Sequence, residues 1–282
     1  MRIARFAAQS SGLGSIRQIS VEPIPMAVDC LNTRPGVKVA SLTDVGCHRE
    51  NNEDALLYWE PESDREFQRK GRLAIIADGM GGYEGGQEAS RLAVETVREI
   101  YEKLHAAPQT ALAESLAAAH QRIHSYALEH RELRGMGTTC TAIAIVGQQL
   151  VWAHVGDSRL YLVRGGAVSL LTRDHSYVGR LVDSGIVRSQ DAQKHPQRHI
   201  LTAALGASRE VDADIPETPL TLEEGDILVL CTDGLWSVVG EQEIAETVKA
   251  EEPAEACTKL VSMALDRGGP DNITLQVLRV AA

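Results

Sequence analysis

The hydrophobic pattern from residue 37 onwards is that of short strands interrupted by helical segments. Residues 37–42 alternate between apolar and polar side chains, as a half-buried strand does, whereas 73–77 form a continuous apolar run of strand length. Similar runs predict further strands at 55–59, 139–146, 150–155, 160–163, 167–171, 227–231 and 273–280. The pair Gly165-Gly166 suits a two-residue hairpin turn, and we expect the strands between 139 and 171 to form a meander.

Four segments have helical periodicity instead. Apolar residues recur every three or four positions in 87–104 and 109–130. Because the link between these two segments is short, we expect them to lie antiparallel and to cover a sheet. A second pair of helices is predicted at 241–249 and 253–266.

Three other regions lack a clear core pattern. Residues 174–205 are polar and interrupted by Pro196, which indicates a surface region with one or two short helices. Residues 61–70 are interpreted as a charged loop. Residues 1–36 are mixed in character, and we interpret them as an N-terminal extension in which only 16–22 could form a strand.

The order of the elements indicates the fold class. Strands, then a helical pair, then strands, then helices imply an α+β sandwich of mainly antiparallel sheets covered by helices, rather than alternating βαβ units. The chain of 282 residues is long enough for one sizeable core. We therefore expect a single domain over 37–282 behind the extension 1–36.

Composition narrows the classes of function. The formal net charge of −11 argues against a general nucleic-acid binder. The five cysteines lack any Cys-x-x-Cys spacing, so they suggest neither a zinc site nor a disulfide framework, and they favour a reducing, cytosolic location. No apolar run approaches the roughly 20 residues that a membrane span needs, so a membrane protein is not expected.

Four aspartates stand at the ends of predicted strands. Asp78 and Asp233 each follow an apolar run directly and precede a glycine, while Asp54 and Asp271 lie at the mouths of strands. Carboxylates gathered in this way, with few His or Cys partners, favour Mg²⁺ or Mn²⁺ over zinc. The glycines after Asp78 are expected to turn the backbone sharply and to expose a carbonyl to a ligand. Taken alone, the stretch 78–82 equally fits a strand-to-helix connection in which Asp78 only forms the turn.

Seven short motifs occur in order along the chain. They are Asp44-x-Gly46-x-x-Arg49-x-x-Asn52-Glu53-Asp54, Asp78-Gly79-Met80-Gly81-Gly82, Gly137-Thr138-Thr139, Gly156-Asp157-Ser158-Arg159, Asp174-His175-Ser176, Asp233-Gly234-Leu235-Trp236 and Gly269-x-Asp271-Asn272-Ile273-Thr274. In this order and spacing they resemble the metal-dependent protein Ser/Thr phosphatases of the PPM (type 2C) family, in its bacterial form. The resemblance covers about residues 37–280.

The resemblance implies a four-layer α-β-β-α sandwich, two stacked antiparallel sheets flanked by helix pairs, with a metal cluster at one end. It implies two Mn²⁺ or Mg²⁺ ions bridged by Asp78. Asp78 and the Gly79 carbonyl would hold one ion, and Asp233 with Asp271 would hold the other. These ions would lower the pKa of a water that attacks the phosphomonoester.

Further roles also follow from the resemblance. Glu53 and Asp54 would orient coordinated waters. Bacterial relatives often hold a third ion, for which Asp157 and Asp233 occupy the matching positions; the alternative for Asp157 is a plain hairpin-turn residue. Arg49 matches the position that forks onto the phosphate oxygens, a planar bidentate task that Lys would do less well. A surface arginine is the alternative for Arg49.

The chain departs from the family pattern in two places. Many eukaryotic members carry a His after the metal-binding Asp-Gly as general acid, but Met80 cannot donate a proton. A coordinated water is then the expected donor, ahead of Glu53 or His48. Residues 195–206 resemble the end of the segment called the flap in bacterial members. Within it, Ala203 stands where relatives frequently have Arg, so the resemblance does not extend to substrate contacts from this segment. His199 in the same region is expected either near the third ion or facing solvent.

We therefore expect a monomeric phosphatase that removes phosphate from phospho-Ser/Thr on proteins with a metal-activated water, opposing a eukaryotic-like Ser/Thr kinase in a bacterium. One alternative is a phosphoprotein-binding pseudophosphatase without catalysis, although the complete acidic set speaks against it. Another is a partner-switching phosphatase dedicated to one regulatory protein, which would usually bring a sensor domain. The sequence does not identify the substrate, the kinase or the role of residues 1–36.

Overall fold

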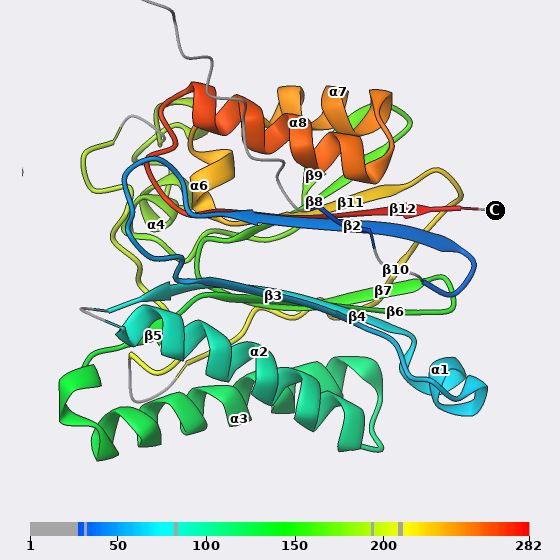
Figure 1. Cartoon of the computed structure of the whole chain (residues 1–282), viewed down its shortest axis with the longest axis horizontal. Helices are drawn as coiled ribbons and strands as arrows, with labels where there is room; N and C mark the ends of the chain where they lie inside the picture. Colours follow the sequence, from blue (N-terminus) through cyan, green and yellow to red (C-terminus); the bar gives the residue numbers. More distant parts are fainter. Residues whose placement is uncertain (1–27, 31–32, 82–83, 193–194, 208–210, 282) are drawn as a thin grey trace, which may run out of the picture.

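The computed structural model describes residues 28–30, 33–81, 84–192, 195–207 and 211–281, which form two stacked antiparallel sheets (Figure 1). The first sheet has the strand order β1 (Asp29–Cys30), β2 (Val37–Asp44), β12 (Ile273–Val280), β11 (Ile227–Cys231), β8 (Arg159–Arg164), β9 (Ala167–Leu170). The second has the order β10 (Leu220–Thr221), β7 (Gln149–Val155), β6 (Cys140–Val146), β4 (Arg72–Met80), β3 (Asp54–Trp59), and β5 (Gly137–Thr138) pairs with β4.

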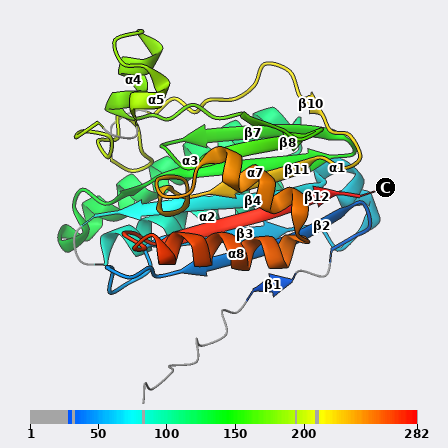
Figure 2. The same ribbon diagram turned by 90° about the horizontal axis from the view of Figure 1, so that it is seen from above.

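Helices cover both outer faces. The helices of the described chain are α1 (Asp64–Lys70), α2 (Gly85–Lys103), α3 (Pro108–Glu129), α4 (Tyr177–Asp183), α5 (Ser189–Ala192), α6 (Asp233–Trp236), α7 (Glu241–Ala250) and α8 (Pro253–Asp266), with a 3-10 turn at Arg131–Leu133. The pair α2 and α3 packs on the second sheet and the pair α7 and α8 on the first, which confirms the expected α-β-β-α sandwich (Figure 1). Figure 2 shows α4 and α5 standing out from the sandwich, apart from both helix pairs. None of the helices in the described ranges combines the length and hydrophobicity of a membrane crossing.

Three hydrophobic clusters fill the three spaces between the four layers. Strand β4 contributes to two of them: Leu73 and Ile75 pack under α2 and α3, while Ala74 and Ile76 pack between the sheets. Because both faces of this strand are buried, its sequence is a continuous apolar run rather than an alternating one. The third cluster lies between the first sheet and the α7–α8 pair.

The topology brings several strand ends to one end of the sandwich. Asp54 at the start of β3 lies opposite Asp78 near the end of β4, and Ile273 at the start of β12 lies opposite Asp44 at the end of β2. Cys231, the last residue of β11, pairs with Arg159 at the start of β8. Side chains from segments far apart in sequence therefore meet at this end.

The expectation of a loop at 61–70 was wrong, because α1 begins there. The Ser63 hydroxyl accepts a hydrogen bond from the Glu66 N–H, which caps the start of the helix. At the other end Gly71 adopts a φ of 63° and its N–H donates to the Phe67 carbonyl. These capping residues define the ends of a helix, although the many charged residues of the segment had indicated a loop.

The expected meander was also wrong, since β7 and β8 belong to different sheets. β6 and β7 form one hairpin in the second sheet, and β8 and β9 form another in the first. The connection 156–158 therefore crosses from one sheet to the other. The turn between β8 and β9 is as predicted, with φ of 58° at Gly165 and 89° at Gly166. The two-residue strands β5 and β10 were not predicted.

Part of the proposed extension contacts the sandwich. β1 pairs with β2 through Asp29 opposite Ser41 and Cys30 opposite Ala40, and Val28 packs against the core under α7 and α8. The expected strand at 16–22 lies outside the described residues. The boundary at residue 37 stays a prediction.

Candidate metal centre

Asp78 and Asp54 face each other across the β4–β3 pair. The backbone of Asp78 is fixed on its other side, where its N–H donates to the Thr139 hydroxyl over 2.9 Å and its carbonyl accepts from the Thr139 N–H over 2.8 Å. The Thr138 hydroxyl donates to the same carbonyl. These bonds leave the Asp78 carboxylate in a defined position at the end of the strand.

Strand β4 continues past Asp78 to Met80, and the turn expected from the glycines comes after it, where Gly81 has a φ of 147°. The role of Gly79 is close packing instead. A Cβ at this position would lie 2.0 Å from the Gly86 carbonyl oxygen and 2.6 Å from that of Glu53. Glycine thus allows α2 and the Glu53 loop to approach the strand that carries Asp78.

Asp233 is the first residue of α6 and follows Thr232, which comes directly after β11. The Thr232 hydroxyl donates to Oδ2 of Asp54 over 2.9 Å, which links the two sheets at this point. Oδ1 of Asp233 is buried and has no hydrogen-bond partner in the described part of the chain. A buried carboxylate oxygen in this state requires a compensating donor or cation.

Asn272 ties the remaining acidic segments together. Its amide donates to the carbonyls of Val45 and Asn51, and its Oδ1 accepts from the Glu53 N–H over 2.8 Å. This arrangement places Glu53 beside Asp271, the residue before Asn272. It also anchors both ends of the loop that contains Arg49.

Arg49 lies among these acids. Its Nη2 donates to Oδ2 of Asp271 over 2.8 Å, and its Nη1 lies 3.9 Å from Oε2 of Glu53. The hydrogen bond to Asp271 raises the pKa of Arg49, so the guanidinium stays charged. The side chain is about half exposed, at 47%. The prediction that it contacts a phosphate is not tested by these contacts.

Asp157 lies in the connection between the two sheets, so the alternative of a plain hairpin-turn residue does not hold. It is buried, and its carbonyl accepts a hydrogen bond from the Trp236 indole N–H over 2.9 Å. Arg159 stacks on the Trp236 ring at 3.7 Å and forms two hydrogen bonds with the Asp174 carboxylate. This network fixes Asp157 relative to α6, which begins with Asp233.

The electrostatics of the cluster favour a bound cation. Burial, followed by the charges of Asp54, Asp233, Asp157 and Asp271, raises the pKa of Asp78 well above its usual range. Burial also raises the pKa of Asp54 to about 8, and burial and the charge of Asp233 raise that of Asp157. Carboxylates that repel one another in this way are stabilised by a divalent ion.

The residues present fit Mg²⁺ or Mn²⁺ in donor chemistry, because they offer carboxylate and carbonyl oxygens and Oδ1 of Asp233 lacks a partner. They do not already form a closed shell: no three His, Cys, Asp or Glu side chains of the described residues converge on one point. Which of the predicted ligands hold an ion therefore stays a prediction.

Four further residues were considered from the sequence. Nδ1 of His199 lies 3.9 Å from Oδ2 of Asp233, and the side chain is 58% exposed, so it faces solvent beside Asp233; a place near a third ion stays a prediction. Met80 pairs with Gly137 at the end of β4. Ala203 packs against the core beneath α2 and α3. His48 is exposed.

Several residues that organise the site were given no role from the sequence. They are Thr139, Thr232, Trp236, Asn272 and Arg159, and all but Thr232 stand within the seven motifs. Each acts by a hydrogen bond or stacking contact to a segment distant in sequence. Only their position next to the predicted ligands could have indicated them.

Comparison with known proteins agrees with these observations. A family model described as protein phosphatase 2C matches residues 48–266. Protein phosphatase PhpP of Streptococcus pneumoniae is 36% identical over 256 residues, which cover 86% of this chain and 97% of that protein. The serine/threonine protein phosphatase PstP of Mycobacterium tuberculosis is 36% identical over 248 residues, which cover 86% of this chain and 45% of PstP.

Solved structures show the same likeness. The crystal structure of M. tuberculosis PstP gives a TM-score of 0.78 at 33% identity, covering 88% of this chain and 100% of that one. The PstP catalytic domain in complex with two manganese ions gives a TM-score of 0.76 at 32% identity, covering 88% and 99%.

Proposed function

The chain belongs to the protein phosphatase 2C family, and we propose that the carboxylate cluster at the end of its sandwich is the active site. The chain is a metal-dependent protein serine/threonine phosphatase of the bacterial PPM type. One observation carries the assignment of the site. Asp54 and Asp78 face each other across two strands while Thr232 joins Asp54 to the segment of Asp233, so the segments that carry these three carboxylates lie together.

Two Mn²⁺ or Mg²⁺ ions are proposed as the cofactor. Asp78 would bridge them, with the Gly79 carbonyl on one ion and Asp233 with Asp271 on the other. The relative PstP, whose catalytic domain was solved with two manganese ions, supports this number. Asp157, fixed beside Asp233 by Trp236, is proposed for a third ion.

The chemistry divides between the ions and the side chains. When bound, divalent ions act as Lewis acids that activate water for attack on a phosphate ester. Arg49 would direct its planar guanidinium at the phosphate oxygens, leaving Asp271 free for the ion. Glu53 and Asp54 would accept hydrogen bonds from waters at the site. Burial raises the pKa of Glu53, which supports Glu53 as a proton source for the leaving oxygen besides the water expected in place of Met80.

Membership of the protein phosphatase 2C family also supports a proposal for the physiological setting. The phosphatase would act on phosphorylated proteins and reverse a Ser/Thr kinase in a signalling pathway, as a monomer. Among the described residues, Cys47, Cys140 and Cys231 are free thiols, which supports a cytoplasmic location. A panel of phosphopeptides separates a broad enzyme from one dedicated to a single regulatory protein, because only the broad enzyme turns over many of them.

Hydrolysis of a phosphoserine peptide and of p-nitrophenyl phosphate under saturating Mn²⁺ tests the proposal. We expect turnover that EDTA abolishes and that falls about a thousandfold or more in Asp78→Asn and Asp233→Asn, since these carboxylates hold the ions. Asp266→Asn, an exposed change at the end of α8, is the matched control and should leave turnover unchanged. Near-normal turnover in both site variants would overturn the active-site assignment, and a wild-type chain that binds phosphopeptides without hydrolysis would be a pseudophosphatase.

A further inference from the structure

Strand β3 is the edge of the second sheet, and β4 is its strand partner in the described chain. The Gly79 N–H donates to the Glu53 carbonyl, so residues 53, 55, 57 and 59 direct their backbone groups towards β4. The alternate residues Leu56 and Tyr58 direct theirs outward. Within the described residues, the N–H and C=O groups of Leu56 and Tyr58 have no hydrogen-bond partner.

Within the described residues, this edge carries neither the lysine nor the proline that often prevents an added strand. Its sequence, Asp-Ala-Leu-Leu-Tyr-Trp, contains no lysine and no proline, and all six residues are half-buried. Edge strands of soluble proteins are commonly protected by charge, proline, a bulge or a covering segment. An extended peptide could therefore pair with β3 through main-chain hydrogen bonds.

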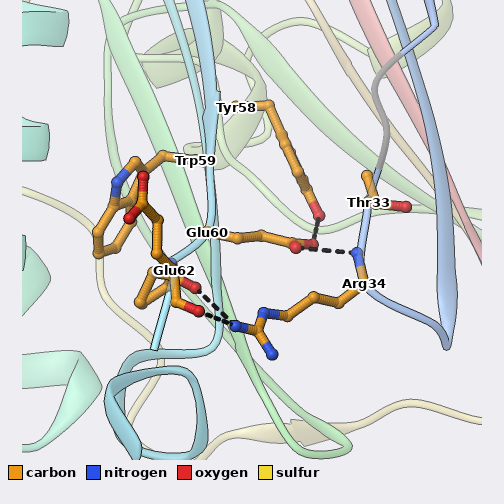
Figure 3. Close-up of a pocket in the computed structure, with 7 residues that line it drawn as sticks. Thr33, Arg34, Tyr58, Trp59, Glu60 and Glu62 are labelled. Carbon is orange, nitrogen blue, oxygen red and sulfur yellow. Dashed lines mark hydrogen bonds between the residues drawn. The ribbon is translucent and has the colours of Figure 1, made fainter. Parts of the chain in front are cut away.

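The two ends of β3 differ in chemistry. Its first residue, Asp54, belongs to the candidate metal centre, with Arg49 nearby on the preceding loop. Its last residues, Tyr58 and Trp59, line a cavity of about 490 Å³ together with Glu60, Pro61 and Glu62, and Thr33 and Arg34 lie across from them (Figure 3). The edge thus runs from the proposed active site to a cavity about 20 Å away, at roughly 3.3 Å per strand residue.

The charges inside the cavity leave one acid free. Glu60 accepts hydrogen bonds from the Tyr58 hydroxyl and the Arg34 backbone N–H (Figure 3). It also pairs with Arg72 at 3.2 Å. The Arg34 guanidinium donates to the Pro61 carbonyl and pairs with Asp64. The charges of Arg34 and Arg72 are therefore already neutralised by acidic partners.

The Glu62 carboxylate, in contrast, has no ion pair or hydrogen bond in the described chain and is exposed. It shares the cavity with Trp59, whose ring already has the Arg98 guanidinium 5.8 Å from its centroid. The ligand group that complements the unpaired Glu62 carboxylate is a positive side chain. The net charge of −11 on the whole chain favours such a ligand as well.

We propose that an extended segment of a phosphoprotein substrate adds to the β3 edge as an antiparallel strand, with a Lys or Arg in the cavity and the phosphoserine at the metal centre. The inference rests on the proposed function. An antiparallel strand runs from the cavity towards the metal centre, so the basic residue precedes the phosphoserine. The six residues of β3 set the separation at about six or seven residues.

A series of phosphoserine peptides with one arginine placed three to nine residues before the phosphoserine tests this spacing. We expect KM to be lowest, by about three- to ten-fold, with arginine at six or seven residues. Glu62→Gln should remove this preference, whereas Glu114→Gln, an equal charge change at an exposed site on α3, should keep it. Hydrolysis of p-nitrophenyl phosphate should be the same in both variants.

Backbone N-methylation of the peptide tests the strand pairing itself. Methylation at alternate residues, which blocks the N–H groups that face β3, should raise KM about ten-fold, and methylation at the residues between them should not. A preference for arginine at another distance, or equal effects of all methylations, would overturn the inference while hydrolysis leaves the proposed function standing. Failure to hydrolyse any of the substrates would overturn the proposed function, and this inference with it.

Discussion

The hydroxyl of Thr232 donates a hydrogen bond to Oδ2 of Asp54 over 2.9 Å and joins the strand end before Asp233 to the first residue of β3. Thr232 is fully buried. Burial raises the pKa of Asp54 to about 8, and this hydrogen bond opposes the rise because it favours the ionised form. The bond therefore helps to keep Asp54 charged and fixed at the point where the two sheets meet.

Replacement of Thr232 by valine removes this hydrogen bond at almost constant volume. Since Asp54 is then less well fixed and less readily ionised, the Mn²⁺ concentration for half-maximal activity should rise about five- to ten-fold. Titration of Mn²⁺ against phosphopeptide hydrolysis measures it, with calorimetric Mn²⁺ binding as a second readout. Thr232→Ser keeps the hydroxyl and is the control; equal Mn²⁺ dependence in all three proteins would show that the bond has no role in the site.

Arg49 should act mainly in substrate binding. A fork onto two phosphate oxygens stabilises the ground state and the transition state alike, so Arg49→Ala should raise KM for a phosphopeptide about ten-fold or more, with a smaller fall in kcat. Arg49→Lys keeps the charge but not the planar fork, so its KM should lie between those of the wild type and Arg49→Ala. Steady-state kinetics under saturating Mn²⁺ decides: an unchanged KM would place Arg49 away from the phosphate, and a collapse of kcat alone would make it a transition-state group.

Asp157 should affect turnover without emptying the two-ion core. Because its carboxylate is proposed for a separate third ion, Asp157→Ala should lower turnover of phosphopeptides several-fold while two Mn²⁺ ions remain bound. Calorimetry counts the ions in the wild type and in the variant. Three ions in the Asp157→Ala protein would disprove the assignment.

The buried His154 should make the stability of the folded chain depend on pH. Its Nε2 faces the carbonyl oxygens of Gly156 and Arg173 at 3.0 and 3.1 Å, so this nitrogen carries the proton and Nδ1 accepts from the Thr141 hydroxyl. Burial, with a smaller effect of the neighbouring His175, lowers the pKa of His154 to about 4. Asp174 and Asp214 oppose this shift only in part.

The unfolded chain, with a histidine pKa near 6.5, binds the proton more readily than the folded chain does between about pH 6.5 and 4. His154 should therefore remove up to about 3 kcal/mol of stability as the pH falls through this window. Urea unfolding at pH 7, 6 and 5 checks it by comparison with His154→Gln, in which this loss should be absent. The comparison cancels the opposite contribution of the buried carboxylates, whose pKa values are raised; equal slopes in both proteins would refute the prediction.

The fold was largely predictable because its layers leave clear patterns in the sequence. Both faces of β4 are covered, so its apolar run is continuous, and the stripes on α2 and α3 each face one core. Periodicity indicates which face of a strand is buried, but not which strand it pairs with, and the jump from β7 to β8 between sheets was therefore missed. Helix α1 was missed because its capping residues, Ser63 and Gly71, were outweighed by the charge between them.

The site was predictable only as far as its carboxylates. Asp78 and Asp233 were indicated by their place after apolar strands, and the family motifs pointed to Asp157. The bonds of Thr232 to Asp54 and of Trp236 to Asp157 depend on how distant segments approach one another, which local pattern does not encode. Gly79 illustrates the same limit, because its use is close packing rather than a turn.

The central claim is that Asp78 and Asp233 hold divalent ions at this end of the sandwich. Anomalous diffraction from a Mn²⁺-soaked crystal tests it most directly. The account predicts two strong peaks about 3.5–4 Å apart, with Asp78 in contact with both and Asp233 in contact with one. Manganese bound elsewhere, with neither Asp78 nor Asp233 within coordination distance in a crystal of the active protein, would contradict it.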